Sequence, residues 1–571
     1  MKVLRNLLAA GLLMSSLSMN AQNAKVQIIH NCADLIADSV DIYAGAFGSG
    51  TIIADNFAFR NASQILSVPS GIPITIYIAP KNSTSSADAI YTQTETLVAN
   101  ENYVIMAQGL VTPASYASNP NGVSTGFGLK IISGAKFGST PGNVDFTVVH
   151  GSTDAPAVDV FANGSIQLVD SAVFKANTNY TTVPAANYWL GVRAANAATN
   201  LLAYDAPLSA FAGKGLTIFA SGFLTPSANQ NGAPFGIFAA DSAGNVVQLS
   251  NSVAQTYIIH NSADPAADSV DVYLNGEKVF DDFGFRRSSG WVNLPAYVPI
   301  SIGVAPKTST SASDILASFP FTLEATNNYV VVANGVLNPA NFAANPGGSS
   351  TGFNLFAYAP ARTSSQNASQ TDVLAFHGVT DAPAVDIRVG AANLFGNLAY
   401  GEFQGYQSSG SDLVLNVAPA GAPTVLASYN APLSALTGQA ITVFASGFLT
   451  PSANQNGRPF GLFAALQNGD VVELSVATSI DKSLSPVGTK LNQIFPNPAT
   501  NQTAVSYTLG ANETAEISII DVMGRTVFSH TQKQSAGTFQ LDIPVTEFSK
   551  GLYSVRLKTD SYEGVSKLLI P

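Results

Sequence analysis

One phrase recurs four times along this chain, and it constrains the fold more than any other feature. Each copy is an apolar run that ends in histidine, with one aspartate four residues later and a second between two aliphatic residues. These residues are His30, Asp34 and Asp41; His150, Asp154 and Asp159; His260, Asp264 and Asp271; and His377, Asp381 and Asp386. Because the copies lie about 110 to 120 residues apart, each spacing can hold a domain with its own core.

The copies are of two types, which we call A and B. Segment 215–240 returns almost unchanged at 440–465, and segment 102–127 returns in the same way at 328–353. A two-domain unit has therefore been duplicated, in the order A-B-A-B. We place repeat A1 at 22–140, B1 at 141–252, A2 at 253–366 and B2 at 367–478.

Apolar residues alternate with polar ones inside each repeat, as in half-buried β-strands. Val40 and Ile42 flank Asp41, and segment 74–78 alternates isoleucine with Thr75 and Tyr77. Turn clusters rich in glycine, proline and asparagine separate these runs, and no long stretch has a helical stripe. The sequence therefore predicts an all-β fold of tandem antiparallel β-sandwich domains, immunoglobulin-like (Ig-like) in architecture.

The N-terminal residues have the order of a secretory signal peptide. Lys2 and Arg5 precede an apolar run at 7–17, and small and polar residues follow. We expect cleavage of residues 1–21 between Ala21 and Gln22. The run is too short to span a bilayer, and no other segment reaches that length without polar interruption, so we expect no transmembrane span.

The repeats resemble the bacterial domain-of-unknown-function 4397 family. The resemblance rests on the strand that ends in histidine, the aspartate four residues on, the Ala-Pro-Ala-Val-Asp phrase and the later Tyr-Val-x-x-Ala-x-Gly strand. It covers about 450 residues, and the A repeats depart from it by two additional residues in the phrase. It implies β-domains outside the cytoplasm and no established activity.

A linker at 479–490 leads to a fifth domain at 491–571, which lacks the repeat phrase and is expected to form a smaller β-sandwich. Four segments, 494–502, 517–529, 548–559 and 566–571, resemble the type A sorting domain of type IX secretion. The motif residues are Pro496, Asn497, Pro498, Gly524, Arg525, Gly551, Tyr553 and Lys567. The resemblance implies the type IX secretion machinery as a partner, passage across the outer membrane of a Gram-negative bacterium, removal of this domain, and release or attachment at the cell surface.

The histidine and aspartates of the phrase allow two interpretations. In the first they form a metal site or an acid–base pair. In the second, which we favour, the histidine ring bonds a turn backbone, Asp34 caps turn N–H groups and Asp41 points outward. Four copies suit a folding motif better than an active site, and one nitrogen without thiolates is a poor zinc site. We therefore expect no catalytic residue, no metal and no cofactor, and we expect the lone Cys32 to be a small core or turn residue.

The best binding candidate is the loop at 221–236, which is nearly identical to 446–461. Its aromatic and amide side chains suit sugars, although recent duplication alone also explains the identity. A net charge of −11 without a basic cluster argues against nucleic acid as a partner. We expect a non-catalytic secreted or cell-surface protein, an adhesin or ligand-binding protein with a glycan or protein ligand. A structural spacer is the alternative, and an enzyme of unrecognised chemistry is a third class.

Overall fold

The computed structural model describes residues 23–477, 489–521, 525–559 and 562–571. Strands joined by turns and short 3₁₀ helices make up these residues, and no α-helix occurs among them. The predicted all-β class is therefore confirmed. The expected cleavage point at Ala21 and Gln22, most of the linker at 479–490, and Gly524 lie outside the described residues.

Each A repeat has an outer and an inner sheet of four strands. In A1 the outer sheet is β3 (Ser49–Ala58), β2 (Ser39–Ala46), β5 (Pro73–Pro80) and β6 (Tyr91–Thr96), and the inner sheet is β4 (Leu66–Pro69), β1 (Asn23–Asn31), β7 (Asn102–Gln108) and β8 (Gly128–Ser133). In A2 the outer sheet is β20 (Glu277–Gly284), β19 (Ser269–Leu274), β22 (Pro299–Pro306) and β23 (Ala317–Thr322), and the inner sheet is β21 (Arg287–Pro295), β18 (Val253–His260), β24 (Tyr329–Asn334) and β25 (Asn354–Tyr358).

Each B repeat has the same plan with a fifth strand in its inner sheet. In B1 the outer sheet is β11 (Ile166–Ala172), β10 (Val158–Ala162), β13 (Asn187–Ala194) and β14 (Leu202–Pro207), and the inner sheet is β12 (Thr181–Pro184), β9 (Asn143–Val149), β15 (Gly215–Ser221), β16 (Gly236–Asp241) and β17 (Val246–Gln248). In B2 the outer sheet is β28 (Ala392–Leu398), β27 (Val385–Val389), β30 (Leu413–Pro419) and β31 (Ala427–Ala431), and the inner sheet is β29 (Phe403–Ser409), β26 (Thr371–His377), β32 (Ala440–Ser446), β33 (Gly461–Ala465) and β34 (Val471–Glu473).

The short 3₁₀ helices lie in the connections between strands. They are η2 (Leu35–Ala37), η3 (Ser86–Asp88), η4 (Pro113–Ser115), η5 (Leu208–Phe211), η6 (Pro226–Ala228), η7 (Pro265–Ala267), η8 (Ala312–Asp314), η9 (Pro339–Asn341), η10 (Leu433–Leu436) and η11 (Pro451–Ala453). Several follow the histidine strands or the later glycine-containing strands, so they help to shape the loop end of each repeat.

The inner sheets are buried on both faces, because the A and B repeats pack against each other through them. Val26 and Ile28 of β1 face the A1 core, whereas Ile29 packs with Val149 and Phe219 of B1. A1 and B1 therefore form one four-layered unit, and A2 and B2 form a second in the same way. We call each unit an A–B pair.

The strand that ends in histidine occupies an interior position in each inner sheet. It pairs in parallel with a strand much later in the repeat, as β1 with β7, β9 with β15, β18 with β24, and β26 with β32. The other strand pairs of the repeats are antiparallel. This arrangement places the end of the histidine strand beside the loop that follows the later strand.

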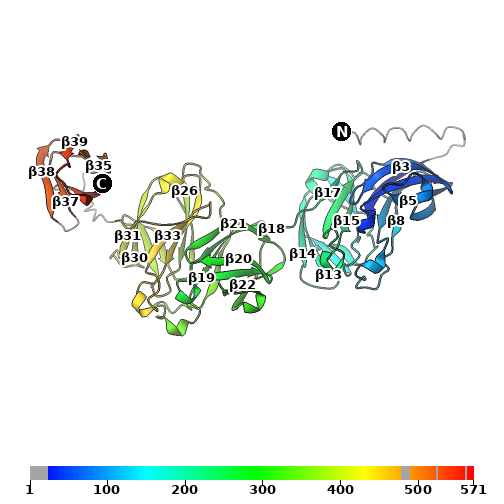
Figure 1. Cartoon of the computed structure of the whole chain (residues 1–571), viewed down its shortest axis with the longest axis horizontal. Helices are drawn as coiled ribbons and strands as arrows, with labels where there is room; N and C mark the ends of the chain where they lie inside the picture. The colour runs from blue at the N-terminus through cyan, green and yellow to red at the C-terminus, as the bar shows by residue number, and fades with distance from the viewer. Residues whose placement is uncertain (1–22, 478–488, 522–524, 560–561) are drawn as a thin grey trace.

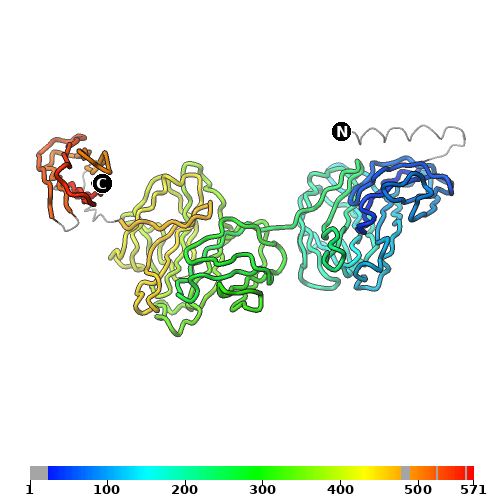
Figure 2. Tube along the Cα trace, in the orientation of Figure 1, coloured from blue at the N-terminus to red at the C-terminus, as the bar shows by residue number. Residues whose placement is uncertain are grey.

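The two A–B pairs are separate bodies joined by a single passage of the chain directly before β18 (Figures 1 and 2). They also touch: the ring of Trp189 in B1 stacks on that of Tyr297 in A2 with centroids 4.1 Å apart. The Asn200 side chain donates a hydrogen bond to the Tyr297 carbonyl over 2.7 Å. The contact between the pairs is thus small beside the shared cores within them.

The C-terminal domain is a two-sheet sandwich with a separate core. One sheet is β35 (Lys490–Phe495), β36 (Gln502–Leu509) and β39 (Gly537–Pro544), and the other is β38 (Thr526–Gln534), β37 (Glu513–Ile520), β40 (Gly551–Lys558) and β41 (Glu563–Ile570). No helix among the described residues of the chain is long and apolar enough to cross a membrane.

Candidate functional site

The four repeat histidines are buried and bond the turn that follows their strand. The His260 ring donates from Nε2 to the Ala267 carbonyl over 2.7 Å, and its Nδ1 accepts the Ser262 N–H over 3.4 Å. His30 makes the same two bonds, to the Ala37 carbonyl and from the Cys32 N–H. Burial lowers the pKa of His30 and His260 to about 4, against a smaller opposing effect of the bonded carbonyl, so both rings are neutral at pH 7.

The B-repeat histidines follow the same plan at their Nε2 atoms. His150 bonds the Pro156 carbonyl and His377 the Pro383 carbonyl, each over 3.0 Å. Burial lowers the pKa of both rings. An imidazole that is buried, neutral and bonded to backbone has neither the access nor the protonation state of an acid–base catalyst.

The first aspartate of the phrase fastens the loop after the later strand. Asp381 accepts hydrogen bonds from the backbone N–H groups of Leu449 and Thr450 and from the Asn454 side chain, over 2.7 to 2.8 Å. Asp154 makes the equivalent three bonds in B1. Asp34 and Asp264 bond the corresponding loops of the A repeats. The first aspartate of the phrase therefore contacts the loop that follows the later glycine-containing strand of the same repeat.

The second aspartate does not point outward to solvent, so the expectation for Asp41 is wrong. Asp41 is 1% exposed and accepts the Asn56 N–H over 2.8 Å and the Ser83 hydroxyl over 2.6 Å. The reason is a β-bulge between β2 and β3, where Asn56 takes a positive φ of 51° and turns its N–H onto the carboxylate.

The same bulge device recurs in the other three repeats. In each, a residue with positive φ donates its N–H to the second aspartate; the pairs are Ser171 with Asp159, Asp282 with Asp271, and Asn397 with Asp386. Non-glycine residues seldom adopt this conformation, so four equivalent cases indicate a built feature of the fold. Sequence reasoning missed it because a bulge leaves the alternation of apolar residues almost unchanged.

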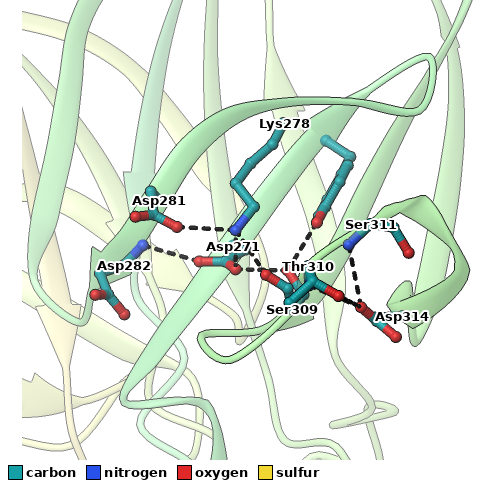
Figure 3. A network of polar contacts seen from close by, with 9 residues as sticks. Asp271, Lys278, Asp281, Asp282, Ser309, Thr310, Ser311 and Asp314 are labelled. Carbon is teal, nitrogen blue, oxygen red and sulfur yellow. Dashed lines mark hydrogen bonds and ion pairs between the residues drawn. The ribbon is translucent and has the colours of Figure 1, made fainter.

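The network is largest in A2, where Asp271 is surrounded by donors (Figure 3). Lys278 bonds it over 2.7 Å and Ser309 over 2.5 Å, beside the Asp282 N–H. Burial opposes the charge on Asp271, but these hydrogen bonds outweigh it and lower its pKa. Lys278 also forms an ion pair with Asp281 over 2.9 Å. The one lysine in Figure 3 thus bridges two aspartates, Asp271 and Asp281.

The described residues contain no group of three or more histidine, cysteine, aspartate or glutamate side chains placed to hold a metal ion. In each repeat the histidine and the two aspartates form hydrogen bonds with three different backbone segments, as His260, Asp264 and Asp271 do in A2. Cys32 is buried, and burial raises the pKa of its thiol to about 12, so no thiolate nucleophile is available at pH 7. These contacts are compatible with the predicted folding role of the phrase, which the following variant tests.

Replacement of one histidine tests whether the phrase is structural. In His260→Ala the Ala267 carbonyl loses its partner inside the protein, which should cost about 1–3 kcal/mol of folding free energy. We expect the melting temperature to fall by several degrees, equally with chelator and with added calcium or zinc. The control is His530→Ala in the sorting domain. A stable variant, with a metal-dependent rise of melting temperature seen only in the parent, would make His260 and Asp264 a ligand site.

The loop proposed for binding joins the two repeats of a pair. In B1 the Phe223 ring is fully buried and stacks on Tyr116 of A1 with centroids 5.4 Å apart. The side chain of Asn229 accepts the Ala117 N–H over 3.0 Å. Phe448, Phe342 and Asn454 repeat these contacts in the second pair.

An arginine from each A repeat completes the joint. Arg60 bonds the Ser221 hydroxyl and the Pro234 carbonyl at the two ends of the B1 loop. Arg286 makes the equivalent bonds to Ser446 and Pro459. The near-identity of the two loops thus has a physical reason, since both hold the same interface. Leu224 and Leu449 are the exposed large apolar side chains of these loops, at 44% each.

Repeat B1 contains a cavity of about 370 Å³ between its two sheets. Its lining is apolar, and it includes Leu224 of the joint loop as well as His150. Cavities of this size and character are typical of small-molecule sites. Sequence reasoning could not find it, because every lining residue type is an ordinary core residue.

In the sorting domain, Asn497 ties the proline-flanked turn to the last strand. Its side chain donates to the Lys567 carbonyl over 2.7 Å and accepts the Leu569 N–H over 2.9 Å. Arg525 pairs with Asp521 over 2.8 Å. Gly551 opens β40, and the Tyr553 hydroxyl bonds the Ser549 carbonyl. Pro496 and Pro498 flank Asn497 in this turn. The motif residues that the structure describes are thus spread over turns and strands and do not form one cluster.

Two family models match the chain. Residues 493–571 match the secretion system C-terminal sorting domain, and residues 144–245 and 254–346 match the domain of unknown function DUF4397. The sorting domain identifies the chain as cargo of the type IX secretion machinery, exported to the surface or surroundings of a Bacteroidetes-type Gram-negative bacterium. Both resemblances noted in the sequence are confirmed.

No curated protein matches the chain. Among solved structures, a pneumococcal glycogen-degrading virulence factor, SpuA, is 9% identical with a TM-score of 0.12, covering 55% of this chain and 37% of its own. SGBP-B of the Bacteroides ovatus mixed-linkage glucan utilization locus, solved in complex with a mixed-linkage heptasaccharide, is 12% identical with a TM-score of 0.11, covering 55% of this chain and 65% of its own. The BSP domain of a biofilm-associated protein is 13% identical with a TM-score of 0.11, covering 59% and 77%. The chain thus spans little more than a third of the first of these structures.

Proposed function

We propose that the DUF4397 repeats of this exported chain form a non-catalytic region that binds a ligand at the cell surface or in the medium, as an adhesin or ligand-binding protein. The observation that carries the proposal is the hollow core of B1, which leaves about 370 Å³ unfilled in a domain with 15 buried apolar side chains in its core cluster. An unfilled cavity lowers stability, so a repeat that served only as a spacer would gain by filling it.

The absence of catalysis in this proposal rests on how the polar residues are used. The repeat histidines are neutral and bond carbonyls, and the aspartates accept backbone N–H groups. Catalytic groups need access to substrate and a suitable pKa, and these side chains are committed to turns. For an exported array of such domains, binding through the surface or the core is the function that this use of the polar residues leaves open.

A structural spacer is the second candidate, and the contact between the two pairs favours it. Trp189 and Tyr297 stack across the junction of B1 and A2, so successive pairs are fixed to each other and not merely tethered. Such an arrangement suits a protein that holds a terminal domain away from a surface.

The mature protein, recovered from the cell surface or the medium, should bind saturably to at least one class of immobilised glycan or matrix protein. We expect Kd values of roughly micromolar or tighter, which is ordinary for a specific exposed site. Heat-unfolded protein is the control for non-specific adsorption. If the folded protein binds none of these, and a deletion strain adheres normally but has an altered surface layer, the spacer function would replace this proposal.

A further inference from the structure

The cavity of B1 lies under its outer sheet, and its lining extends along strand β10 and across β11, β13 and β14. Val158 and Ala162, at the two ends of β10, both line it. Four steps along a strand cover about 13 Å, so the hollow runs the length of β10. Three steps across the sheet cover about 14 Å, so the lining is about as broad as it is long and encloses a space between the two sheets.

The lining offers no charged side chain to a ligand, and one polar atom in it is unpartnered, since Nδ1 of His150 is buried without a hydrogen bond. Among the residues that line the cavity, His150 and Tyr188 carry the polar side-chain atoms. Nε2 of His150 bonds the Pro156 carbonyl, and the Tyr188 hydroxyl bonds the Pro184 carbonyl over 3.1 Å. A charged group inside would therefore be desolvated without an ionic partner, which restricts the enclosed part of any ligand to uncharged groups, with one acceptor at Nδ1 of His150.

The cavity also reaches the surface through exposed apolar side chains. Ile166, Leu201 and Leu224 line it, and they are 51%, 59% and 44% exposed. Leu201 follows the end of β13 and Leu224 belongs to the joint loop, whereas Ile166 begins β11. A ligand could thus enter at an end of the sandwich and leave a polar head group in water.

The related repeat B2 leaves less of the equivalent space open. Its cavity is only about 110 Å³. The strand register aligns four positions at which B2 carries the larger residue: Val160 with Ile387, Ala162 with Val389, Val169 with Phe395, and Ala172 with Leu398. Other exchanges run the other way, since B2 carries the smaller residue in the pairs Phe146 with Val373, Ile166 with Ala392, Tyr188 with Leu413, and Leu202 with Ala427. The two B repeats are nearly identical in the joint loop and differ in this part of the core.

We infer that B1, and not B2, binds an amphiphile, with its uncharged apolar part between the two sheets and its polar head at the surface. This inference deepens the ligand-binding function proposed above by naming the ligand class for one repeat. The contrast between the copies supports it, because a smaller cavity is compatible with the fold, as B2 shows, and B1 has kept the larger space.

Reciprocal exchange of one core residue tests the inference. In the purified mature protein, the uncharged dye 1-aminoanthracene should bind at one site per chain with a rise in fluorescence, and decanol should displace it. Val169→Phe should weaken binding by about tenfold or more, since one ring occupies the place of several methylenes. The converse variant, Phe395→Val, should add binding capacity in B2.

Ala172→Leu provides a second filling variant if Val169→Phe does not fold, and circular dichroism and melting check each protein. Absence of saturable dye binding in the parent, or equal affinity in the parent and both folded filling variants, would overturn the inference. Surface adhesion is measured separately on glycans and matrix proteins. Adhesion without saturable dye binding in the parent refutes the cavity site alone, whereas saturable dye binding without adhesion refutes the adhesin function alone.

Discussion

Each A–B pair is expected to lose stability steeply between pH 7 and pH 5, because its repeat histidines are buried without charge. The folded-state pKa of His30 and His260 is about 4, below the ordinary 6.5. The stabilising effect is complete above pH 6.5, where folded and unfolded chains are both neutral. It is lost as pH falls, since the unfolded chain takes up a proton first. At pH 5 one such histidine costs about 2 kcal/mol.

Urea unfolding of the chain at a series of pH values measures this effect. The histidines of the B repeats, whose pKa is also lowered by burial, should add to it. His260→Gln should remove close to one proton from the pH dependence of its own pair, whatever its effect on stability at pH 7. Unfolding free energies that stay constant from pH 7 to pH 5 would contradict the buried, neutral state of these rings.

Removal of the ring that joins two repeats should destabilise the second A–B pair strongly. Phe448 is fully buried and stacks on Phe342 of the neighbouring repeat with centroids 5.6 Å apart. Phe448→Ala should cost about 3–5 kcal/mol, because a large cavity opens between A2 and B2. We also expect the second pair to unfold in two steps instead of one, which chemical denaturation followed by two spectroscopic probes would reveal.

The next residue in the same loop is a matched control. Leu449 is 44% exposed, so Leu449→Ala should change the free energy of unfolding by no more than about 0.5 kcal/mol. Its backbone N–H, which bonds Asp381, is retained in the variant. Similar small losses for both substitutions would mean that the loop does not hold the repeats together.

The sequence is enough to predict the all-β class and the sorting domain, because both depend on local patterns. Alternation of apolar residues such as Val40 and Ile42 reports a strand wherever that strand packs. The sorting motifs lie in order along the chain, as at Pro496 and Gly551. Four copies of one phrase also indicate a folding role for His260 without any geometry, and that role stays a prediction until His260→Ala is measured.

Contacts between distant segments are beyond such reasoning. The pattern marks Ile29 only as one residue of an apolar strand, but its neighbours are Val149 and Phe219 of another repeat. Alternation alone predicts an exposed Asp41, because the bulge that covers its carboxylate depends on Asn56, which carries no pattern of its own. The B1 cavity arises from the combined volumes of side chains on several strands, and composition does not record how they fit together.

The interior position of each histidine strand has a consequence for how fast the protein can fold. The first strand of a repeat completes its sheet only with a strand much later in the chain, as β1 does with β7. Contacts between the repeats reach further, and the Gln27 side chain bonds the Asp241 carbonyl across 214 residues. Long loops must close before these contacts form, so the entropy cost of closure is met before the stabilising contacts exist, and folding is expected to be slow. Until the later strand arrives, the backbone of β1 is an open edge on which a second unfolded chain can pair.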